Sequence, residues 1–150
     1  MSRLAHLIAT VGGIGHARPA PGTWGSAVAL PPAWVIQAHG GPWALLLAAA
    51  LVFAVGCWAA GTHIAATGRQ DPPEVVIDEV AGQWLVLVPA PNEPLLYLAG
   101  FLLFRLLDIA KPWPASWADT RVHGGLGAML DDVLAALYGC LAMAAWVALR

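Results

Sequence analysis

Long apolar runs alternate with short polar stretches along most of this chain. The clearest run, residues 43–62 (WALLLAAALVFAVGCWAAGT), contains 20 residues without one charge, and residues 133–149 form a second uncharged run. About 20 apolar residues let a helix cross a bilayer, although a buried helix of a soluble protein has the same pattern. The two runs leave too little polar sequence for a soluble surface, so we expect membrane-embedded helices.

Glycine and proline divide the first half of the chain. Residues 11–26 (VGGIGHARPAPGTWGS) predict a loop. A short helix from about residue 24 to residue 38 should follow, with Thr23 or Ser26 as its cap. Residues 39–42 (HGGP) then predict a turn before the first long apolar run.

Two further helices are predicted in the second half. The string DPPE at residues 71–74 has the residue types of a helix start, and this helix should continue to residue 88. Residues 89–94 (PAPNEP) predict a turn. Residues 95–107 predict a helix that ends near Lys111, because the following proline disfavours a helical residue before it.

The charges are distributed unevenly if the N-terminus is cytoplasmic and five apolar segments cross in turn. Arg150 and Glu93 then fall outside, while the other six cations and eight acids fall on the cytoplasmic side. This is the usual bias of multi-pass proteins. We therefore expect one all-α domain, residues 1–150, forming a bundle of four to five apolar helices in the cytoplasmic (inner) membrane, with a polar site facing the cytoplasm. Segments 24–38 and 80–88 are short for full spans, and re-entrant segments fit them equally well.

Composition supports the membrane class and excludes others. The chain is 59% hydrophobic and 11% charged, against about 25% charged residues in soluble domains. A net charge of −2 and a pI near 6.1 give no sign of nucleic-acid binding. Cys57 and Cys140 lie inside apolar runs, so we expect packing residues rather than a disulfide or a metal site.

Two pairs of adjacent acids lie among apolar residues. Asp78 and Glu79 occur within VVIDEVAGQW, and Asp131 and Asp132 follow the glycine-rich string GGLG just before the last apolar run. Adjacent carboxylates at membrane depth are unfavourable unless they are paired or bind metal. Mg²⁺ prefers a few carboxylates, so these four residues are candidate Mg²⁺ ligands. Acids that only stabilise a helix start are the alternative for the second pair.

Two cations accompany these acids on a predicted helix. Arg105, Asp108 and Lys111 are spaced three residues apart and therefore lie on one side of it. An intrahelical ion pair explains this spacing. Alternatively, Arg105 and Lys111 hold phosphate oxygens while Asp108 orients one of them or binds metal.

Two other features have weaker patterns. The string PGTWGS at residues 21–26 offers the amide of Gly22 and the hydroxyls of Thr23 and Ser26 as an anion cradle at a helix start, but an ordinary capped turn fits as well. The histidines are scattered, and no two of them have the spacing of metal ligands: His6, His16, His39, His63 and His123.

Four strings together resemble the phosphatidylglycerophosphatase A family in order and spacing: APGTWGS (20–26), VVIDEVAGQW (75–84), FRLLDIAKPWP (104–114) and GGLGAMLDDVLAALYG (124–139). The resemblance runs from about Gly12 to Gly139. It implies a helical fold and Mg²⁺-dependent removal of the terminal phosphate of phosphatidylglycerophosphate, giving phosphatidylglycerol. Ala115 replaces a common isoleucine of the family, and the charged motif positions show no departure: Asp78, Glu79, Arg105, Asp108, Lys111, Asp131 and Asp132.

The expected function is therefore hydrolysis of a lipid phosphomonoester at the membrane surface. The catalytic candidates are Asp78, Glu79, Asp108, Asp131 and Asp132, of which all but Asp108 are the candidate metal ligands. The phosphate-binding candidates are Gly22, Thr23, Ser26, Arg105 and Lys111.

The expected partners are the phosphatidylglycerophosphate substrate and the bilayer, without nucleic acid. The nucleophile, water or an aspartate, and the oligomeric state stay open. Another membrane lipid phosphatase or a phosphotransferase would use the same site. A Mg²⁺-binding transporter would instead need polar residues along a path through the bilayer, and the two uncharged runs argue against it.

Overall fold

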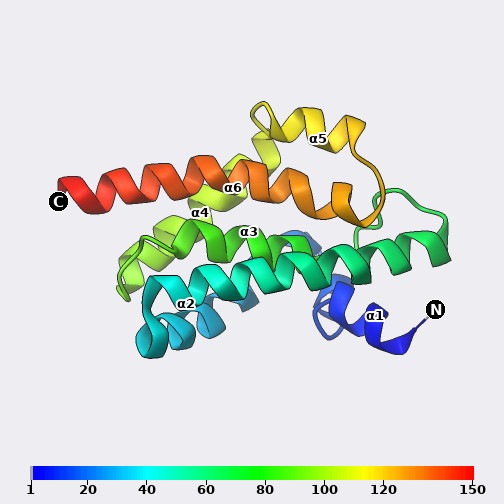
Figure 1. Cartoon of the computed structure of the whole chain (residues 1–150), viewed down its shortest axis with the longest axis horizontal. Coiled ribbons are helices and arrows are strands. Elements are labelled where there is room, and N and C mark those ends of the chain that lie inside the picture. The colour runs from blue at the N-terminus through cyan, green and yellow to red at the C-terminus, as the bar shows by residue number, and fades with distance from the viewer. Residues whose placement is uncertain (1) are drawn as a thin grey trace.

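Helices make up the whole regular structure of the chain. The computed structural model describes residues 2–150, and within that range it contains no strand. The predicted all-α class is confirmed. Figure 1 shows the elements in chain order: α1 (Arg3–Ala9), the short 3-10 helix η1 (Ile14–His16), α2 (Pro21–Thr67), α3 (Ile77–Leu87), α4 (Pro94–Ala110), α5 (Ala115–Arg121) and α6 (Gly124–Leu149).

α2 is a hairpin of two helical segments rather than one straight helix. Gly41 breaks it with φ 72° and ψ −171°, a conformation that glycine adopts readily, and the next residue is a proline. The predicted turn at residues 39–42 is therefore confirmed. α2 starts at Pro21, where a proline suits the first helical turn. The expected cap by Thr23 or Ser26 is wrong, since no side chain in the described part of the chain caps this start.

α3 is the central helix of the molecule. It lies between α2 and α6 (Figure 1), and eight of its 11 residues are buried. The indole N–H of Trp84 donates a hydrogen bond of 2.8 Å to the carbonyl of Ala29 in α2. Eleven residues extend about 16 Å, which is well below the roughly 30 Å hydrocarbon thickness of a bilayer. α3 alone is thus too short to cross a membrane.

The predicted start of this helix at residues 71–74 is wrong. α3 begins at Ile77, and residues 68–76 form a loop. Pro73 disfavours a helical conformation at Pro72, which explains why the DPPE string does not begin a helix. Glu74 is not part of a helix cap. Its side chain instead contacts His63 and Arg69.

In the second half of the chain, α4 agrees with the prediction, whereas α5 and the start of α6 differ from it. α4 ends as expected, with Lys111 as its C-cap. α5 follows it and packs on α6 (Figure 1), although the sequence predicted no helix there. α6 already begins at Gly124, so Asp131 lies inside the helix and not at its start. The glycine-rich string is helical and forms a contact surface: a Cβ on Gly125 would lie 1.8 Å from the carbonyl oxygen of Cys57.

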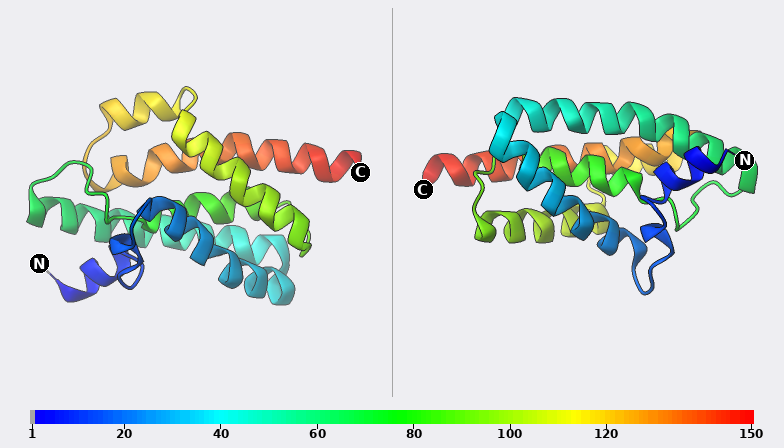
Figure 2. Two further views of the ribbon diagram at one scale, coloured as in Figure 1. Left: turned by 180° about the vertical axis from the view of Figure 1, so that it is seen from behind. Right: turned by 90° about the horizontal axis from the view of Figure 1, so that it is seen from below.

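Within residues 2–150, two helices, α2 and α6, are long and apolar enough to cross a membrane by length and composition. The molecule is elongated along them, and its two ends differ (Figures 1 and 2). One end holds the α2 turn, the α3–α4 connection and the C-terminus, where Arg150 Nη1 lies 2.8 Å from Glu93 Oε2. The other end holds α1, α5 and the 68–76 loop. All the acid pairs noted in the sequence lie toward this second end.

Candidate active site

A cavity of about 350 Å³ opens at the α5 end of the bundle. Every major helix except α1 contributes to its wall, as does the 68–76 loop. Seven carboxylate side chains and only two cationic ones line it: Asp78 and Glu79 from α3, Asp108 from α4, Asp119 from α5, Asp131 and Asp132 from α6, Asp71 from the loop, and the cations Arg105 and Lys111.

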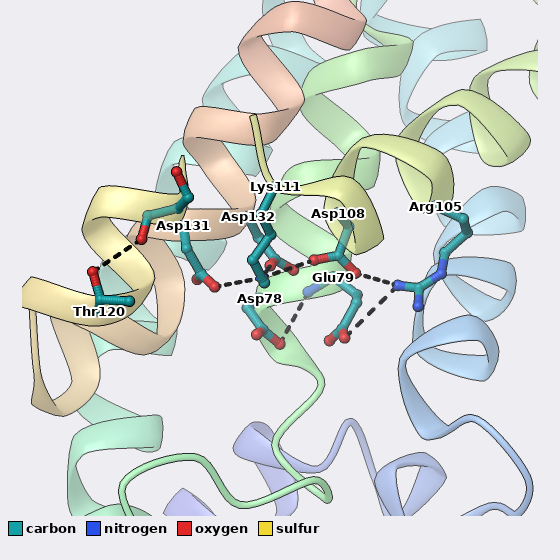
Figure 3. Close-up of polar contacts among 9 residues, drawn as sticks. Asp78, Glu79, Arg105, Asp108, Lys111, Thr120, Asp131 and Asp132 are labelled. Atoms are coloured by element: carbon teal, nitrogen blue, oxygen red, sulfur yellow. Dashed lines mark hydrogen bonds and ion pairs between the residues drawn. The ribbon is translucent and has the colours of Figure 1, made fainter. Parts of the chain in front are cut away.

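Two groups of three carboxylates converge in this cavity. Within each group one oxygen from every residue lies within 4.8 Å of the others, and Asp132 belongs to both: Asp78, Asp131 and Asp132 form the first, and Glu79, Asp108 and Asp132 form the second. Figure 3 shows these side chains pointing toward one another from α3, α4 and α6. The chain thus brings together all five residues that the sequence marked as catalytic candidates.

Several oxygens of these groups have no hydrogen-bond partner. Within residues 2–150, Glu79 Oε2, Asp131 Oδ1 and Asp132 Oδ2 are buried and unpaired. Asp132 is only 2% exposed. A buried carboxylate oxygen without a partner is strongly unfavourable. Clustered, unpaired, acceptor-only oxygens are the donor set that hard divalent cations prefer, so the residues present fit a Mg²⁺ site.

Lys111 bridges the two carboxylate groups, whereas Arg105 contacts two members of the second group. Arg105 Nη1 donates to Asp108 Oδ2 at 2.6 Å and lies 3.9 Å from Glu79 Oε1. Lys111 Nζ donates to Asp131 Oδ2 at 2.7 Å and to Asp108 Oδ1 at 3.4 Å. The spacing of Arg105, Asp108 and Lys111 therefore produces an intrahelical ion pair and also aims both cations at the cavity (Figure 3).

Lys111 reaches the cavity because α4 ends at this residue. Its backbone has φ 45° and ψ 66°, a left-handed conformation that is uncommon for a side chain other than glycine, asparagine or aspartate. Burial acts to lower the pKa of Lys111. The nearby carboxylates, Asp132 foremost and then Asp131 and Asp108, raise this pKa above its ordinary value. Lys111 therefore stays cationic at neutral pH.

Gly22 is the part of the 21–26 string that lines the cavity. A Cβ at this position would lie 2.4 Å from Glu79 Oε1 and 3.2 Å from Arg105 Nη1. Only a residue without a side chain leaves both groups where they are. Gly22 thus belongs to the site through a close approach between the start of α2 and the acid–cation cluster.

The other two candidates of that string are placed differently. Thr23 and Ser26 are absent from the cavity wall formed by residues 2–150. Ser26 is fully buried, and its hydroxyl has no hydrogen-bond partner in the described chain. Gly25 next to it packs against Val76, since a Cβ on Gly25 would lie 3.0 Å from the Val76 Cβ. The structure therefore brings Gly22 into the site but not the two hydroxyls.

Two acids that the sequence did not single out for the site also line the cavity. Asp119 comes from α5, the helix that was not predicted, and Asp71 comes from the loop that was expected to be helical. Both are exposed. The sequence signal for Asp119 was its place in a polar stretch between two apolar runs. The direction in which the Asp119 side chain points, however, depends on α5, a helix of only seven residues.

Comparison with known proteins identifies the family. The family model described as Phosphatidylglycerophosphatase A matches residues 7–147, nearly the whole chain. The chain belongs to the phosphatidylglycerophosphatase A family. The resemblance inferred from the four sequence strings is thereby confirmed, and the chain is an enzyme of this family. No solved structure matches it.

Three relatives of the chain have 38% identity to it. A protein of Escherichia coli (strain K12) named phosphatidylglycerophosphatase A aligns over 90% of this chain and 78% of its own length. A Haemophilus influenzae protein of the same name aligns over 91% of this chain and 84% of its own length. A Bacteroides thetaiotaomicron protein, provisionally named phosphatidylinositol-3-phosphatase, aligns over 97% of this chain and 96% of its own length. All three names describe removal of phosphate from a phospholipid.

Proposed function

We propose that this chain hydrolyses the terminal phosphate of phosphatidylglycerophosphate with Mg²⁺ at the cytoplasmic end of a multi-pass membrane bundle. One observation carries the proposal: two carboxylate groups that share Asp132 lie beside Arg105 and Lys111 in a single cavity. Membership in the phosphatidylglycerophosphatase A family, and the names of two relatives, support this substrate.

The charge of the cavity supports a metal requirement. Seven carboxylates against two cations would repel a phosphate monoester. Asp78, Glu79, Asp131 and Asp132 would hold the metal, and Asp108 completes the second group. Bound Mg²⁺ would supply positive charge for the phosphate and lower the pKa of a water molecule. Two groups that share one residue favour two ions over one.

Phosphate binding is assigned to Gly22, Arg105 and Lys111. Arg105 offers a planar fork that fits phosphate oxygens, and Lys111 adds a point charge between the two carboxylate groups. The N–H of Gly22 belongs to the first turn of α2, where amides lack partners within the helix. The cavity wall excludes Thr23 and Ser26, so we do not assign phosphate binding to their hydroxyls.

The outside of the bundle supports insertion in a bilayer. Large apolar side chains are exposed along several helices, among them Leu47, Leu51, Leu102 and Leu141, each 58–70% exposed. Exposure of this many large apolar side chains is unusual in a soluble monomer. A lipid substrate could keep its acyl chains beside these helices while its phosphate enters the cavity. Six of the seven cations occur toward the cavity end in the predicted topology, which favours a cytoplasmic site.

Phosphate release from defined lipids tests the proposal. Purified protein in mixed micelles is given phosphatidylglycerophosphate, phosphatidic acid or phosphatidylinositol 3-phosphate, each with Mg²⁺ and with chelator. We expect release from phosphatidylglycerophosphate that stops with chelator and returns with Mg²⁺. Equal rates with chelator would overturn the metal site. Preference for phosphatidylinositol 3-phosphate would assign the chain the activity named for its Bacteroides relative.

A product assay separates hydrolysis from phosphoryl transfer to an alcohol. The reaction is repeated with added glycerol, and the products are resolved. Hydrolysis predicts free phosphate in the same amount as phosphatidylglycerol. A phosphorylated alcohol in place of free phosphate would identify a phosphotransferase.

A further inference from the structure

Three histidines that are scattered in the sequence come together away from the carboxylate cavity. His6 lies on α1, His16 on η1 and His63 near the end of α2. The ring centroids of His6 and His63 are 5.3 Å apart, and those of His6 and His16 are 5.5 Å apart. The sequence spacing of these histidines does not indicate a shared site, but the fold brings their rings together because α1 packs against the far end of α2.

The closest pair faces each other through ring nitrogens. His6 Nδ1 lies 3.4 Å from His63 Nδ1. This is long for a hydrogen bond, whose usual length is about 2.9–3.0 Å. Two imidazole nitrogens bound to one tetrahedral zinc ion at about 2.0–2.1 Å are separated by roughly 3.3–3.4 Å. The separation of the two Nδ1 atoms therefore matches two ligands of one ion.

A carboxylate orients the buried member of the pair. His63 is 2% exposed, and its Nε2 lies 3.0 Å from Glu74 Oε1. If Nε2 carries the proton and donates it to Glu74, Nδ1 of His63 keeps its lone pair and faces His6. Metal-binding histidines commonly donate their second N–H to a carboxylate in this way. Arg69 also contacts Glu74 Oε1, but its side chain is 53% exposed and lies on the carboxylate side of His63.

We propose that His6 and His63 bind a divalent transition-metal ion of the zinc class through their Nδ1 atoms, with Glu74 as the residue that orients His63. His16, which is exposed and adjacent to His6, supplies a third nitrogen after rotation of its ring. Imidazole donors suit zinc, whereas the carboxylate cavity suits Mg²⁺. The ion would tie α1 to α2 and to the loop that leads into α3, four residues before Asp78.

Zinc binding in the presence of saturating Mg²⁺ tests this site. The purified full-length protein in detergent is stripped with chelator, dialysed into excess Mg²⁺ and titrated with Zn²⁺ against a chromophoric zinc indicator. We expect one Zn²⁺ per chain. Co²⁺ in place of Zn²⁺ should give the visible absorption of a tetrahedral nitrogen site. Zn²⁺ should also raise the melting temperature, because it binds only the folded chain.

Four variants assign the ligands. His6→Ala removes a partly exposed ligand with little risk to the fold, and His63→Gln removes the buried one. Both should abolish the zinc-dependent rise in melting temperature. Glu74→Gln should weaken zinc binding about 10- to 100-fold, the usual effect of losing an orienting carboxylate. His39→Ala is the matched control, since His39 is exposed and bonds only to the carbonyl of Val35 within residues 2–150.

Two results would overturn the proposal. One is the absence of stoichiometric Zn²⁺ binding in excess Mg²⁺, which would mean that the histidine pair only shares a proton. The other is an unchanged zinc affinity in His6→Ala. Neither readout depends on phosphate release, so the zinc site and the proposed phosphatase activity can fail independently.

Discussion

Asp78 and Asp132 bring carboxylate oxygens within 4.8 Å of each other from two different helices, α3 and α6. Two like charges at this distance in a poorly hydrated site repel each other strongly. Packing elsewhere must hold them together. Gly82 of α3 and Gly139 of α6 allow that packing: a Cβ on Gly82 would lie 3.3 Å from the carbonyl oxygen of Asp132, and one on Gly139 would lie 2.8 Å from Val86. The helices therefore force together acids that would otherwise separate.

Asp132→Asn should reduce phosphate release by at least about 100-fold, since Asp132 belongs to both carboxylate groups and losing a metal ligand costs more than losing a residue that only orients one. Phosphate release at saturating Mg²⁺ measures the effect, with circular dichroism as the check on folding. Asp71→Asn is the matched control. Asp71 lines the same cavity but belongs to neither group. Equal losses in the two variants would contradict the special role of Asp132.

The same variant should be more stable than the wild type when metal is removed. Asp132→Asn deletes one of the clustered negative charges and so relieves repulsion that only a cation or a proton could otherwise offset. Melting temperatures in chelator and in excess Mg²⁺ measure this. We expect the variant to melt higher in chelator and the wild type to gain more from Mg²⁺. A lower melting temperature for the variant in chelator would argue that Asp132 is paired within the protein alone.

Arg105→Lys should reduce turnover about 100-fold, the usual effect of losing one donor to a reacting phosphate or acyl group. Lysine keeps the charge but loses the planar fork of donors that can bind two phosphate oxygens at once. Arg121→Lys makes the same exchange at an exposed position of α5 and should leave turnover unchanged. Normal turnover in Arg105→Lys would reduce Arg105 to a simple counter-charge.

Gly22→Ala should lower activity about 10- to 100-fold while the chain stays folded. The new methyl group would lie 2.4 Å from Glu79 Oε1, so the flexible Glu79 side chain must move, and small displacements in an active site have effects of this size. Gly61→Ala is the control: its nearest contact would be an ordinary 3.5 Å to Gly125. Full activity in Gly22→Ala would show that the position of Glu79 is not critical.

Cysteine labelling in oriented vesicles should place the two ends of the bundle on opposite sides. Cys57 and Cys140 are first replaced by alanine, and a single cysteine is introduced by Arg150→Cys or Arg69→Cys. A membrane-impermeant maleimide should label the first variant from the outside only and the second from the cytoplasmic side only. Labelling of both from one side would contradict the multi-pass arrangement.

The sequence predicted the α4 helix and the α2 turn well, because both depend on local chemistry. Pro112 ends α4 and Gly41 breaks α2 wherever these segments lie in the fold. The predicted start of α3 is wrong for a related local reason, because Pro73 disfavours the helical conformation at Pro72 that a helix starting at the DPPE string requires. The start of α6 at Gly124 could not be predicted in this way, because it depends on a contact between distant parts of the chain. Gly125 lets the first turn of α6 approach the backbone of Cys57 in α2, and no local sequence pattern shows this contact.

The sequence predicted the main charged residues of the site, but it did not predict every residue that lines the cavity. Isolated acids and cations in an apolar chain are conspicuous, and they converge in the cavity with Gly22. Thr23 and Ser26 were expected beside Gly22. Thr23 lies on another face of α2, and Ser26, one turn further along the same face as Gly22, is fully buried and does not reach the cavity. Asp71 and Asp119 reach the cavity from a loop and a seven-residue helix, whose directions depend on tertiary packing.

The place of Asp131 and Asp132 on α6 has a consequence for how the enzyme is made. α6 follows all the other helices in chain order, so a ribosome releases it after the rest of the bundle. Before that moment the first carboxylate group has only Asp78, and the second has Glu79 and Asp108 but lacks Asp132. On the proposed assignment, a partly synthesised chain holds neither complete carboxylate group, and we expect activity only once the final helix packs against α3. Ribosome-stalled or truncated chains are expected to be catalytically silent in the membrane.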